Sequence, residues 1–292
     1  MTLLALQTEV HPQDYLSQRA FRERVFALLE EGFGQAPPPR LAAFPEAFAL
    51  PLLLYLEAEP LLEATTLAQA LLHHLRREGP LFPWRRAQRA FYLWKEVFQE
   101  AARTFGAYLL AGSLFTPLYD EELSRGRFLR GAGFYNLALL LNPKGQVLAR
   151  VPKMRLTREE GFLKGGGFGP HLVQTEHGRI GVLICLDAFF QSHVERLDAL
   201  GAELLLVPSA NPAPWDRPWP RDPARKEGEV WVEAMAKQLE GRENLRLLLN
   251  PMLNGRFLDL LFEGEAGVYR AGEPPRLSGR PRGDAFLKVF WE

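Results

Sequence analysis

The chain has 292 residues, and because 47% of them are hydrophobic it can bury a large core and is not a disordered protein. Lysine plus arginine and aspartate plus glutamate number 35 each, so the net charge is zero and gives no global attraction to nucleic acid or to anionic membranes. The single cysteine excludes an intrachain disulfide and argues against a cysteine-based metal site.

The start of the chain and its most apolar window bear on location. The first residues, MTLLALQTEV, lack a basic segment and predict a strand rather than a signal peptide. The most apolar window, residues 41–56, is interrupted by prolines and a glutamate and is too short to span a bilayer. Together with the single cysteine, these features predict a cytoplasmic protein that has no membrane partner.

Strands alternate with helices along the chain, as judged from apolar spacing and from cap and turn signals. In chain order we expect a strand at 2–10, a helix at 17–31, a strand at 41–44, helices at 57–77 and from about 85 to 104, a strand at 107–113, a hairpin at 134–151, strands at 171–176 and 181–185, a helix at 192–202, a strand at 203–210, a helix at 230–242 and a strand at 245–251.

This order of elements predicts a fold class. Apolar strands that alternate with helices are typical of a layered α/β domain. The hairpins at 134–151 and 171–185 predict that the sheets are mixed rather than all parallel. Since no repeat and no linker interrupts the pattern, residues 1–292 are expected to form a single domain.

Cys185 is the candidate nucleophile. It ends the apolar run GVLIC, and the expected helix after it carries Ser192 as N-cap with Glu195 completing a capping box. A thiol near a helix start lies near the positive end of the helix dipole, which favours the thiolate. A lone cysteine is more often a small buried hydrophobe. Glu46 in FPEAF and Lys153 in VPKMRLT, each also at a strand end, favour the nucleophile.

Several segments, taken together, resemble the nitrilase, or carbon–nitrogen hydrolase, superfamily. FPE at 44–46 resembles the glutamate motif of that family, residues 135–156 resemble its lysine segment, and GRIGVLICLD at 178–187 resembles its cysteine segment. Further matches lie at 195–210 and at Glu243, Asn244, Asn250 and Gly255. The matches keep their order from residue 5 to about residue 270, which is nearly the whole chain.

The resemblance implies a four-layer α-β-β-α sandwich and a catalytic set of Glu46, Lys153 and Cys185. The thiolate would attack a carbonyl or nitrile carbon and form a covalent intermediate. Glu46 would serve as general base and acid. Lys153 and the backbone N–H of Leu186 would stabilise the oxyanion.

The resemblance also implies a second glutamate after the lysine segment. Glu159 and Glu160 are both candidates, and the spacing favours Glu160; the alternative is a solvated pair of charges. Tyr135 and Ser209, which lie inside matched segments, are expected to contact the substrate together with Leu186.

Three departures from the family pattern bear on the substrate. FFQS at 189–192 replaces an aromatic–Pro–Glu sequence, and Leu186 replaces an aromatic residue. Residues 51–84 are longer than usual and are expected to form an enlarged helical insert at the rim of the pocket. These differences alter the pocket wall, so a relative's substrate cannot be transferred directly.

The function expected from these residues is an amidase-type hydrolase of a small linear amide. Nitrile hydrolysis and acyl transfer by the same three residues are the enzymatic alternatives, and a non-catalytic binding or assembly protein is the alternative from another class. A Cys–His hydrolase is disfavoured because the six histidines lie in no recognisable signature, and His73–His74 or His171 with His177 lack the usual metal-ligand spacing. We expect no metal, no cofactor and a homodimer or larger homo-oligomer.

Overall fold

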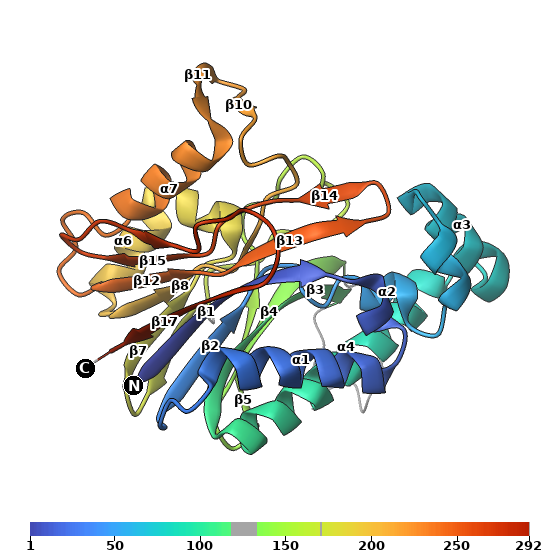
Figure 1. Cartoon of the computed structure of the whole chain (residues 1–292), viewed down its shortest axis with the longest axis horizontal. Coiled ribbons are helices and arrows are strands. Elements are labelled where there is room, and N and C mark those ends of the chain that lie inside the picture. Colours follow the sequence, from blue (N-terminus) through green and yellow to red (C-terminus); the bar gives the residue numbers. More distant parts are fainter. Residues whose placement is uncertain (118–132, 170, 292) are drawn as a thin grey trace.

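The computed structural model describes residues 1–117, 133–169 and 171–291. Two β-sheets pack face to face, and helices cover the outer face of each sheet (Figure 1). This arrangement has four layers in the order α-β-β-α, which confirms the expected fold class.

The first sheet has nine strands and is mixed. Its strand order is β14-β13-β1-β2-β3-β4-β5, with β17 paired to β1 and β9 paired to β13. Strands β1 to β3 run parallel, whereas β3, β4 and β5 form antiparallel pairs. The strands are β1 (Thr2–Val10), β2 (Arg40–Phe44), β3 (Ala107–Pro117), β4 (Phe134–Leu141), β5 (Val147–Pro152), β9 (Ser209–Ala210), β13 (Met252–Phe257), β14 (Leu260–Phe262) and β17 (Ala285–Phe290).

The second sheet has six strands in the order β16-β15-β12-β8-β7-β6. A separate ribbon of two short strands projects beyond this sheet, at the top of Figure 1. The strands are β6 (Leu172–Thr175), β7 (Gly178–Val182), β8 (Leu204–Leu206), β12 (Leu247–Asn250), β15 (Gly267–Arg270) and β16 (Arg276–Leu277), with β10 (Pro218–Trp219) and β11 (Asp222–Lys226) in the ribbon.

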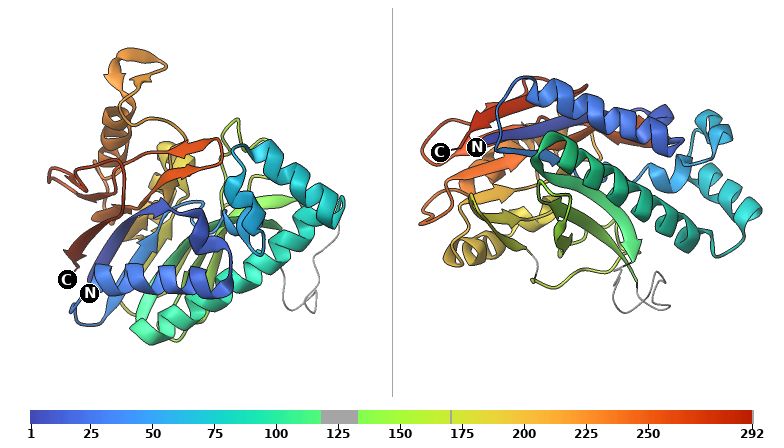
Figure 2. Two further views of the ribbon diagram at one scale, coloured as in Figure 1. Left: turned by 45° about the vertical axis from the view of Figure 1, so that its right-hand side comes forward. Right: turned by 90° about the horizontal axis from the view of Figure 1, so that it is seen from below.

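Three clusters of buried side chains fill the interfaces between the layers. Helices α1 (Gln18–Phe33) and α4 (Phe82–Phe105) lie side by side on the first sheet, where Trp94 packs in one cluster with Leu139 (Figure 2). The next residue of β4, Leu140, faces the second sheet and shares a cluster with Ile180. Helices α6 (Gln191–Ala199) and α7 (Glu227–Lys237) cover the second sheet, where Met235 is buried. Strand alternation thus separates the outer core from the core between the sheets.

Helix ends in the first layer follow local rules. The Ser17 hydroxyl accepts a hydrogen bond from the N–H of Ala20 and caps α1. Helix α4 ends at Gly106, whose φ of 56° is in the left-handed region that glycine adopts readily. The ends of α1 and α4 lie within three residues of the ends of the helices expected at 17–31 and from about 85 to 104.

The insert differs from the single helix expected at 57–77. It contains the short helix α2 (Leu52–Tyr55), a 3-10 helix at Glu59–Glu63 and helix α3 (Leu67–Glu78), which projects at the right of Figure 1. Pro60 stands in the first turn of the 3-10 helix, and Thr66 begins α3 with a capping box to Gln69. These two signals each start a new helix, so the segment forms two separate helices instead of one.

The segment after Cys185 also differs from the expectation. Strand β7 ends at Val182, and Cys185–Phe189 form a 3-10 helix before α6. The N-cap of α6 is Phe190, and no side chain caps it, so the predicted Ser192–Glu195 capping box is wrong. Asp187 accounts for the difference, because its carboxylate accepts the Ile184 N–H and stabilises a tight turn there.

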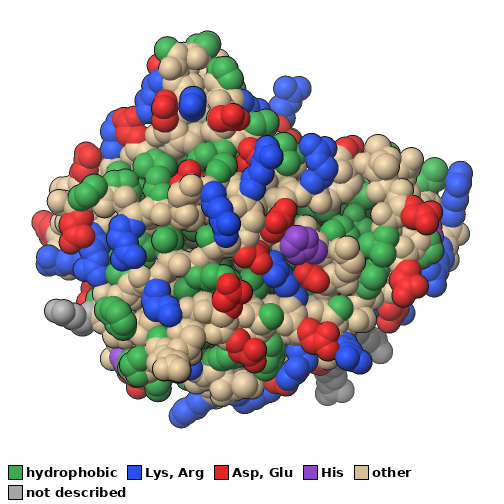
Figure 3. Space-filling model, in the orientation of Figure 1, with side chains coloured by type: hydrophobic (Ala, Val, Ile, Leu, Met, Phe, Trp, Pro, Cys, Tyr) green, Lys and Arg blue, Asp and Glu red, His purple; other side chains and the backbone are tan. Residues whose placement is uncertain are grey.

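The apolar length of the helices and the charges on the surface can be described together. None of the helices in the described ranges is long and apolar enough to cross a membrane. The face seen in Figure 3 mixes acidic and basic side chains, in keeping with the zero net charge of the chain.

Candidate active site

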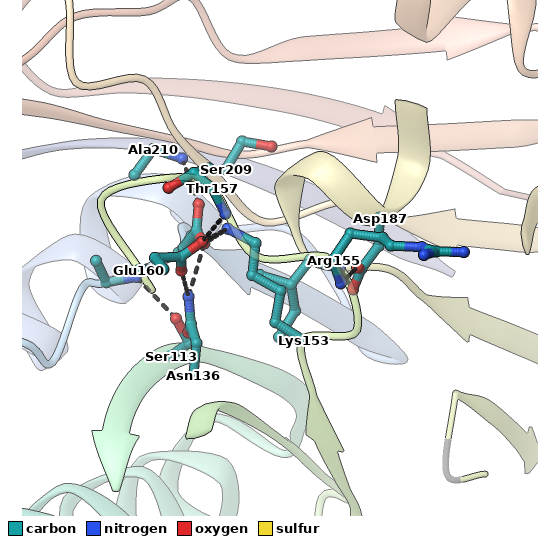
Figure 4. A network of polar contacts seen from close by, with 12 residues as sticks. Ser113, Asn136, Lys153, Arg155, Thr157, Glu160, Asp187, Ser209 and Ala210 are labelled. Carbon is teal, nitrogen blue, oxygen red and sulfur yellow. Dashed lines mark hydrogen bonds and ion pairs between the residues drawn. The ribbon is translucent and has the colours of Figure 1, made fainter. Parts of the chain in front are cut away.

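Segments that follow three strands meet in one buried cluster. Figure 4 shows the polar contacts around Lys153 and Glu160 in this cluster. Glu46 follows β2, Lys153 follows β5, and Cys185 lies three residues beyond the end of β7. The Lys153 Nζ is 2.7 Å from Glu46 Oε1 and 2.7 Å from Glu160 Oε2. The charges of Glu46 and Lys153 both influence the pKa of the buried Cys185 thiol. The structure therefore brings together the four residues proposed from the sequence.

The turn that carries Glu46 lies against strand β3. The N–H of Ala47 donates to the Ser113 hydroxyl at 2.8 Å. A Cβ at Gly112 would lie 2.3 Å from the carbonyl oxygen of Pro45, and the φ of Gly112 is 69°. Only glycine allows this approach without strain, so Gly112 lets β3 support the Glu46 turn directly.

Glu46 is buried and its carboxylate has several donors. Its Oε1 accepts hydrogen bonds from Lys153 and from Asn136 Nδ2, each at 2.7 Å, and its Oε2 accepts the Ala210 N–H at 3.0 Å. Burial raises the pKa of Glu46 above its ordinary value, and the charge of Lys153 opposes that rise. A carboxylate of raised pKa beside a thiol can take the thiol proton.

Glu160, and not Glu159, points into the cluster. Its Oε2 accepts from the Lys153 ammonium and from the Thr157 N–H at 2.9 Å, and its Oε1 accepts from Asn136 Nδ2 at 2.9 Å. Glu159 is exposed to solvent. The turn at Thr157 therefore directs one of the two adjacent carboxylates to Lys153.

Lys153 is held as a cation. Burial lowers the pKa of its ammonium, but the charges of Glu46 and Glu160 oppose burial, and its pKa lies above the ordinary value. Only 1% of Lys153 is exposed, so its charge acts within a region that excludes bulk water.

Cys185 occupies a constrained backbone position. Its φ is 50°, in the left-handed region, and its N–H donates to the Pro208 carbonyl at 2.9 Å. A non-glycine residue in this region is strained, and such strain is found preferentially at functional sites. The thiol points from a sharp turn at the end of the β7 segment into the cluster.

The sequence predicts that a helix dipole activates the thiol, and this prediction is wrong. Helix α6 begins only at Gln191, after the 3-10 turn. Burial raises the pKa of Cys185 well above its ordinary value; Glu46 raises it further, and Lys153 opposes the rise. The thiol therefore needs a base to remove its proton, and Glu46 is the carboxylate whose charge acts most strongly on it.

The three expected substrate contacts lie in different environments. Ser209 is fully buried, and its hydroxyl donates to the Val207 carbonyl at 3.2 Å and accepts from Asn250 at 2.9 Å. Leu186 follows Cys185 in the 3-10 turn and is partly buried. Tyr135 precedes Asn136 on β4, so strand alternation places it on the opposite face from the cluster.

Tyr135 and Ser209 were expected to contact the substrate, but it is their neighbours in sequence, Asn136 and Ala210, that contact the cluster. Asn136 bridges Glu46 and Glu160, and the N–H of Ala210 binds Glu46. Period-two alternation could have identified Asn136, because Ala138 and Leu140 on the same face point toward the other sheet. No sequence signal identifies a backbone N–H such as that of Ala210.

The histidines and metal-ligating residues do not contribute an alternative centre within the described ranges. No group of three or more His, Cys, Asp or Glu side chains there could hold a metal ion. His171 is buried, its Nε2 lies 3.2 Å from the Pro152 carbonyl, and burial lowers its pKa to about 4. The strongest electrostatic influences on Cys185 come from Glu46 and Lys153 rather than from a histidine.

Comparison with known proteins shows which sequences this chain resembles. Residues 14–238 match the family model described as carbon-nitrogen hydrolase. Deaminated glutathione amidase of Mus musculus is 31% identical over 134 residues, which are 41% of this chain and 39% of that protein. A protein of Pseudomonas protegens called "Hydrolase in pqqF 5'region" is 36% identical over 108 residues, which are 36% of each chain. The matched region thus spans less than half the length of these curated relatives.

Solved structures show the same fold. A carbon-nitrogen hydrolase from Helicobacter pylori superposes with a TM-score of 0.68 at 19% identity, over 99% of this chain and 90% of that chain. An amidase variant from Nesterenkonia sp. AN1, with acrylamide added at its active-site cysteine, superposes with a TM-score of 0.65 at 18% identity, over 100% of this chain and 93% of that chain. At these identities the likeness concerns the fold alone.

Proposed function

The chain belongs to the carbon–nitrogen hydrolase family, and we propose that it cleaves the C–N bond of a small linear amide through an acyl-enzyme on Cys185. The observation that carries the proposal is the buried cluster in which the Lys153 ammonium binds Glu46 and Glu160, and in which Glu46 and Lys153 are the charged groups that act most strongly on Cys185. The relatives named as amidases support the choice of an amide over a nitrile.

Acylation begins with proton transfer. Glu46 takes the thiol proton of Cys185, and the sulfur attacks the carbonyl carbon of the amide. The C–S bond forms while the carbonyl π electrons move to oxygen, and Lys153 with the Leu186 N–H stabilises that oxyanion. Glu46 then gives its proton to the leaving nitrogen, the C–N bond breaks, and ammonia or an amine departs.

Deacylation uses the same groups. Glu46 removes a proton from water, and the resulting hydroxide attacks the thioester carbon. The C–S bond breaks, the sulfur recovers the proton from Glu46, and a carboxylic acid leaves. Glu160 keeps Lys153 charged through both half-reactions, because it is the second carboxylate bonded to Nζ.

The test is to trap the acyl-enzyme with a panel of small amides and to measure the intact mass of the protein. We expect a mass increase equal to the acyl group, release of ammonia or amine, and neither signal in Cys185→Ala. Nitriles and acceptor amines in parallel reactions distinguish nitrile hydrolysis and acyl transfer. The absence of any Cys185 adduct and of turnover over the whole panel would contradict the proposal and favour a binding protein.

A further inference from the structure

Asp187 lies two residues after the proposed nucleophile and binds two separate segments of the site. It is fully buried. Its Oδ1 accepts the N–H groups of Met154 at 3.0 Å and Arg155 at 2.6 Å, directly after Lys153. Its Oδ2 accepts the N–H of Met154 at 3.1 Å and that of Ile184, directly before Cys185, at 3.3 Å.

We infer that Asp187 is a positioning residue that fixes the Lys153 ammonium relative to the Cys185 sulfur. The inference rests on the proposed function for the roles of those two residues. The hydrogen bonds of the Asp187 carboxylate all go to the backbone, and they include the N–H groups of Met154 and Ile184, which are adjacent to Lys153 and Cys185 in sequence.

The fold explains why such a link is needed. Lys153 follows β5 in the first sheet, whereas Cys185 follows β7 in the second. Ladder hydrogen bonds run within a sheet and cannot set the distance between residues that leave two different sheets. The side chain of Asp187 provides direct hydrogen bonds between these segments, one residue away from each reacting group. Its main-chain carbonyl is also 3.0 Å from His193 Nδ1, which ties the turn to α6.

The charge state suits this role at neutral pH. Burial raises the pKa of Asp187 to about 6, while the N–H groups of Arg155 and Met154 and the charge of Lys153 oppose a further rise. At neutral pH the group is therefore a carboxylate, and both oxygens accept hydrogen bonds. An amide at this position would present an NH₂ group to one of the same N–H donors and would separate the segments.

The chain offers a matched control in Asp198. This residue is 7% exposed, and its carboxylate accepts the N–H groups of Glu243, Asn244 and Leu245 at 3.0, 2.8 and 2.8 Å. Asp198 thus makes the same kind of link between α6 and a distant loop, without contacting the segments of Lys153 or Cys185. A purely structural role predicts the same behaviour for Asp187→Asn and Asp198→Asn.

The experiment compares these two variants of the full chain. Active sites are counted by iodoacetamide labelling, and kcat and KM are measured on the amide that the panel identifies. We expect Asp187→Asn to lower kcat per labelled site by about 10²-fold with little change in KM, as misplacement of reacting groups does. Asp198→Asn should lose stability and keep its kcat. An unchanged kcat in Asp187→Asn, or an equal loss in both variants, would overturn the inference.

Two further measurements keep the test decisive. If Asp187→Asn does not fold, Asp187→Glu retains the charge and shifts the oxygens outward, and a wild-type kcat in that variant would overturn the inference. The rate constant for alkylation of Cys185 by iodoacetamide needs no turnover, and we expect it to fall in Asp187→Asn by a similar factor. If the wild-type protein hydrolyses no amide, the proposed function fails, while the alkylation rates still test the role of Asp187.

Discussion

Two buried ionic clusters, one at the candidate active site and one in the insert, resemble each other in composition but not in chemistry. At the site, one ammonium serves two carboxylates, those of Glu46 and Glu160. In the insert, Glu78 Oε1 accepts a hydrogen bond at 2.7 Å from the guanidinium of Arg86, a residue of α4 just beyond the insert. Its other donors bind the main-chain carbonyls at the end of α2, namely those of Leu53, Leu54 and Leu56.

The comparison shows that a buried ion pair does not by itself indicate a reactive site. The guanidinium of Arg86 stays protonated in proteins, and it satisfies carbonyls that the end of a helix leaves without partners. The site cluster contains an acid of raised pKa, Glu46, whose charge acts on the thiol of Cys185. A proton can therefore move within the cluster at the candidate active site, whereas no useful proton transfer is possible between Arg86 and Glu78.

The largest expected effects come from removing the groups that move or balance protons at the site. Glu46→Gln should slow both acylation and deacylation by about 10²–10⁴-fold, because a general base is lost. Lys153→Ala should cost about 10²–10³-fold, because an oxyanion donor is lost. Single-turnover kinetics on the trapped amide would separate the two half-reactions. Full kcat in Lys153→Ala would show that the oxyanion assignment is wrong.

In the insert we expect a loss of stability and not of catalysis. Arg86→Met removes one partner of a buried pair and leaves Glu78 and the helix carbonyls unsatisfied, so the free energy of unfolding should fall by about 3–5 kcal/mol. Urea denaturation measures this change, and kcat per labelled Cys185 should stay at the wild-type value. A kcat that falls along with stability would place the insert among the groups that shape the site.

The adjacent residues Glu159 and Glu160 allow a buried charge bonded to Lys153 to be compared with an exposed charge next to it in sequence. Glu160→Gln removes a charge bonded to Lys153, and we expect kcat to fall by about 10²-fold, at the low end for proton-transfer groups. Glu159→Gln changes an exposed residue and should alter stability by less than about 0.5 kcal/mol with little effect on activity. The reverse result would exchange the two assignments, and no loss in either variant would mean that Glu46 and Lys153 act without a fourth partner.

The smallest expected effect concerns pH, because the insert cluster contains a buried histidine. The His74 Nε2 lies 2.8 Å from the Leu54 carbonyl, and burial, with the nearby charge of Arg86, lowers the pKa of His74. The unfolded chain then binds more protons than the folded one below about pH 6.5, so stability should fall as the pH drops through that value. Thermal unfolding between pH 7 and 5 should show a shallower decline for His74→Gln than for the wild-type protein.

Much of the site could be predicted from the sequence because its reactive residues follow strands in recognisable segments. Glu46, Lys153 and Cys185 lie after β2, β5 and β7, and the four-layer fold matches the one implied by those segments. Glu160 could be chosen over Glu159 from spacing. The roles of these residues remain proposals, whereas their convergence is a property of the structure.

The contacts that hold the site could not be predicted, because they depend on which strands are neighbours. Asn136 reaches both carboxylates only because β4 lies beside β5, and the Ala210 N–H reaches Glu46 across a long separation in sequence. The capping box at Ser192 failed for the same reason. Its local pattern is sound, but the tertiary hydrogen bonds of Asp187 fold the preceding residues into a 3-10 turn.

The position of β1 in the first sheet has a consequence for the order in which the protein can fold. One edge of β1 pairs with β2, and the other pairs with β17 over Thr2–Gln7 and with β13 over Gln7–Val10. A ribosome makes β1 long before it makes these last two partners, because nearly all the other strands and helices lie between them in the chain. One edge of an apolar strand therefore stays open while most of the chain emerges, and an open edge can pair wrongly. Closing such distant pairs is slow, so the sheet that supports Glu46 is completed only after nearly all the other elements exist.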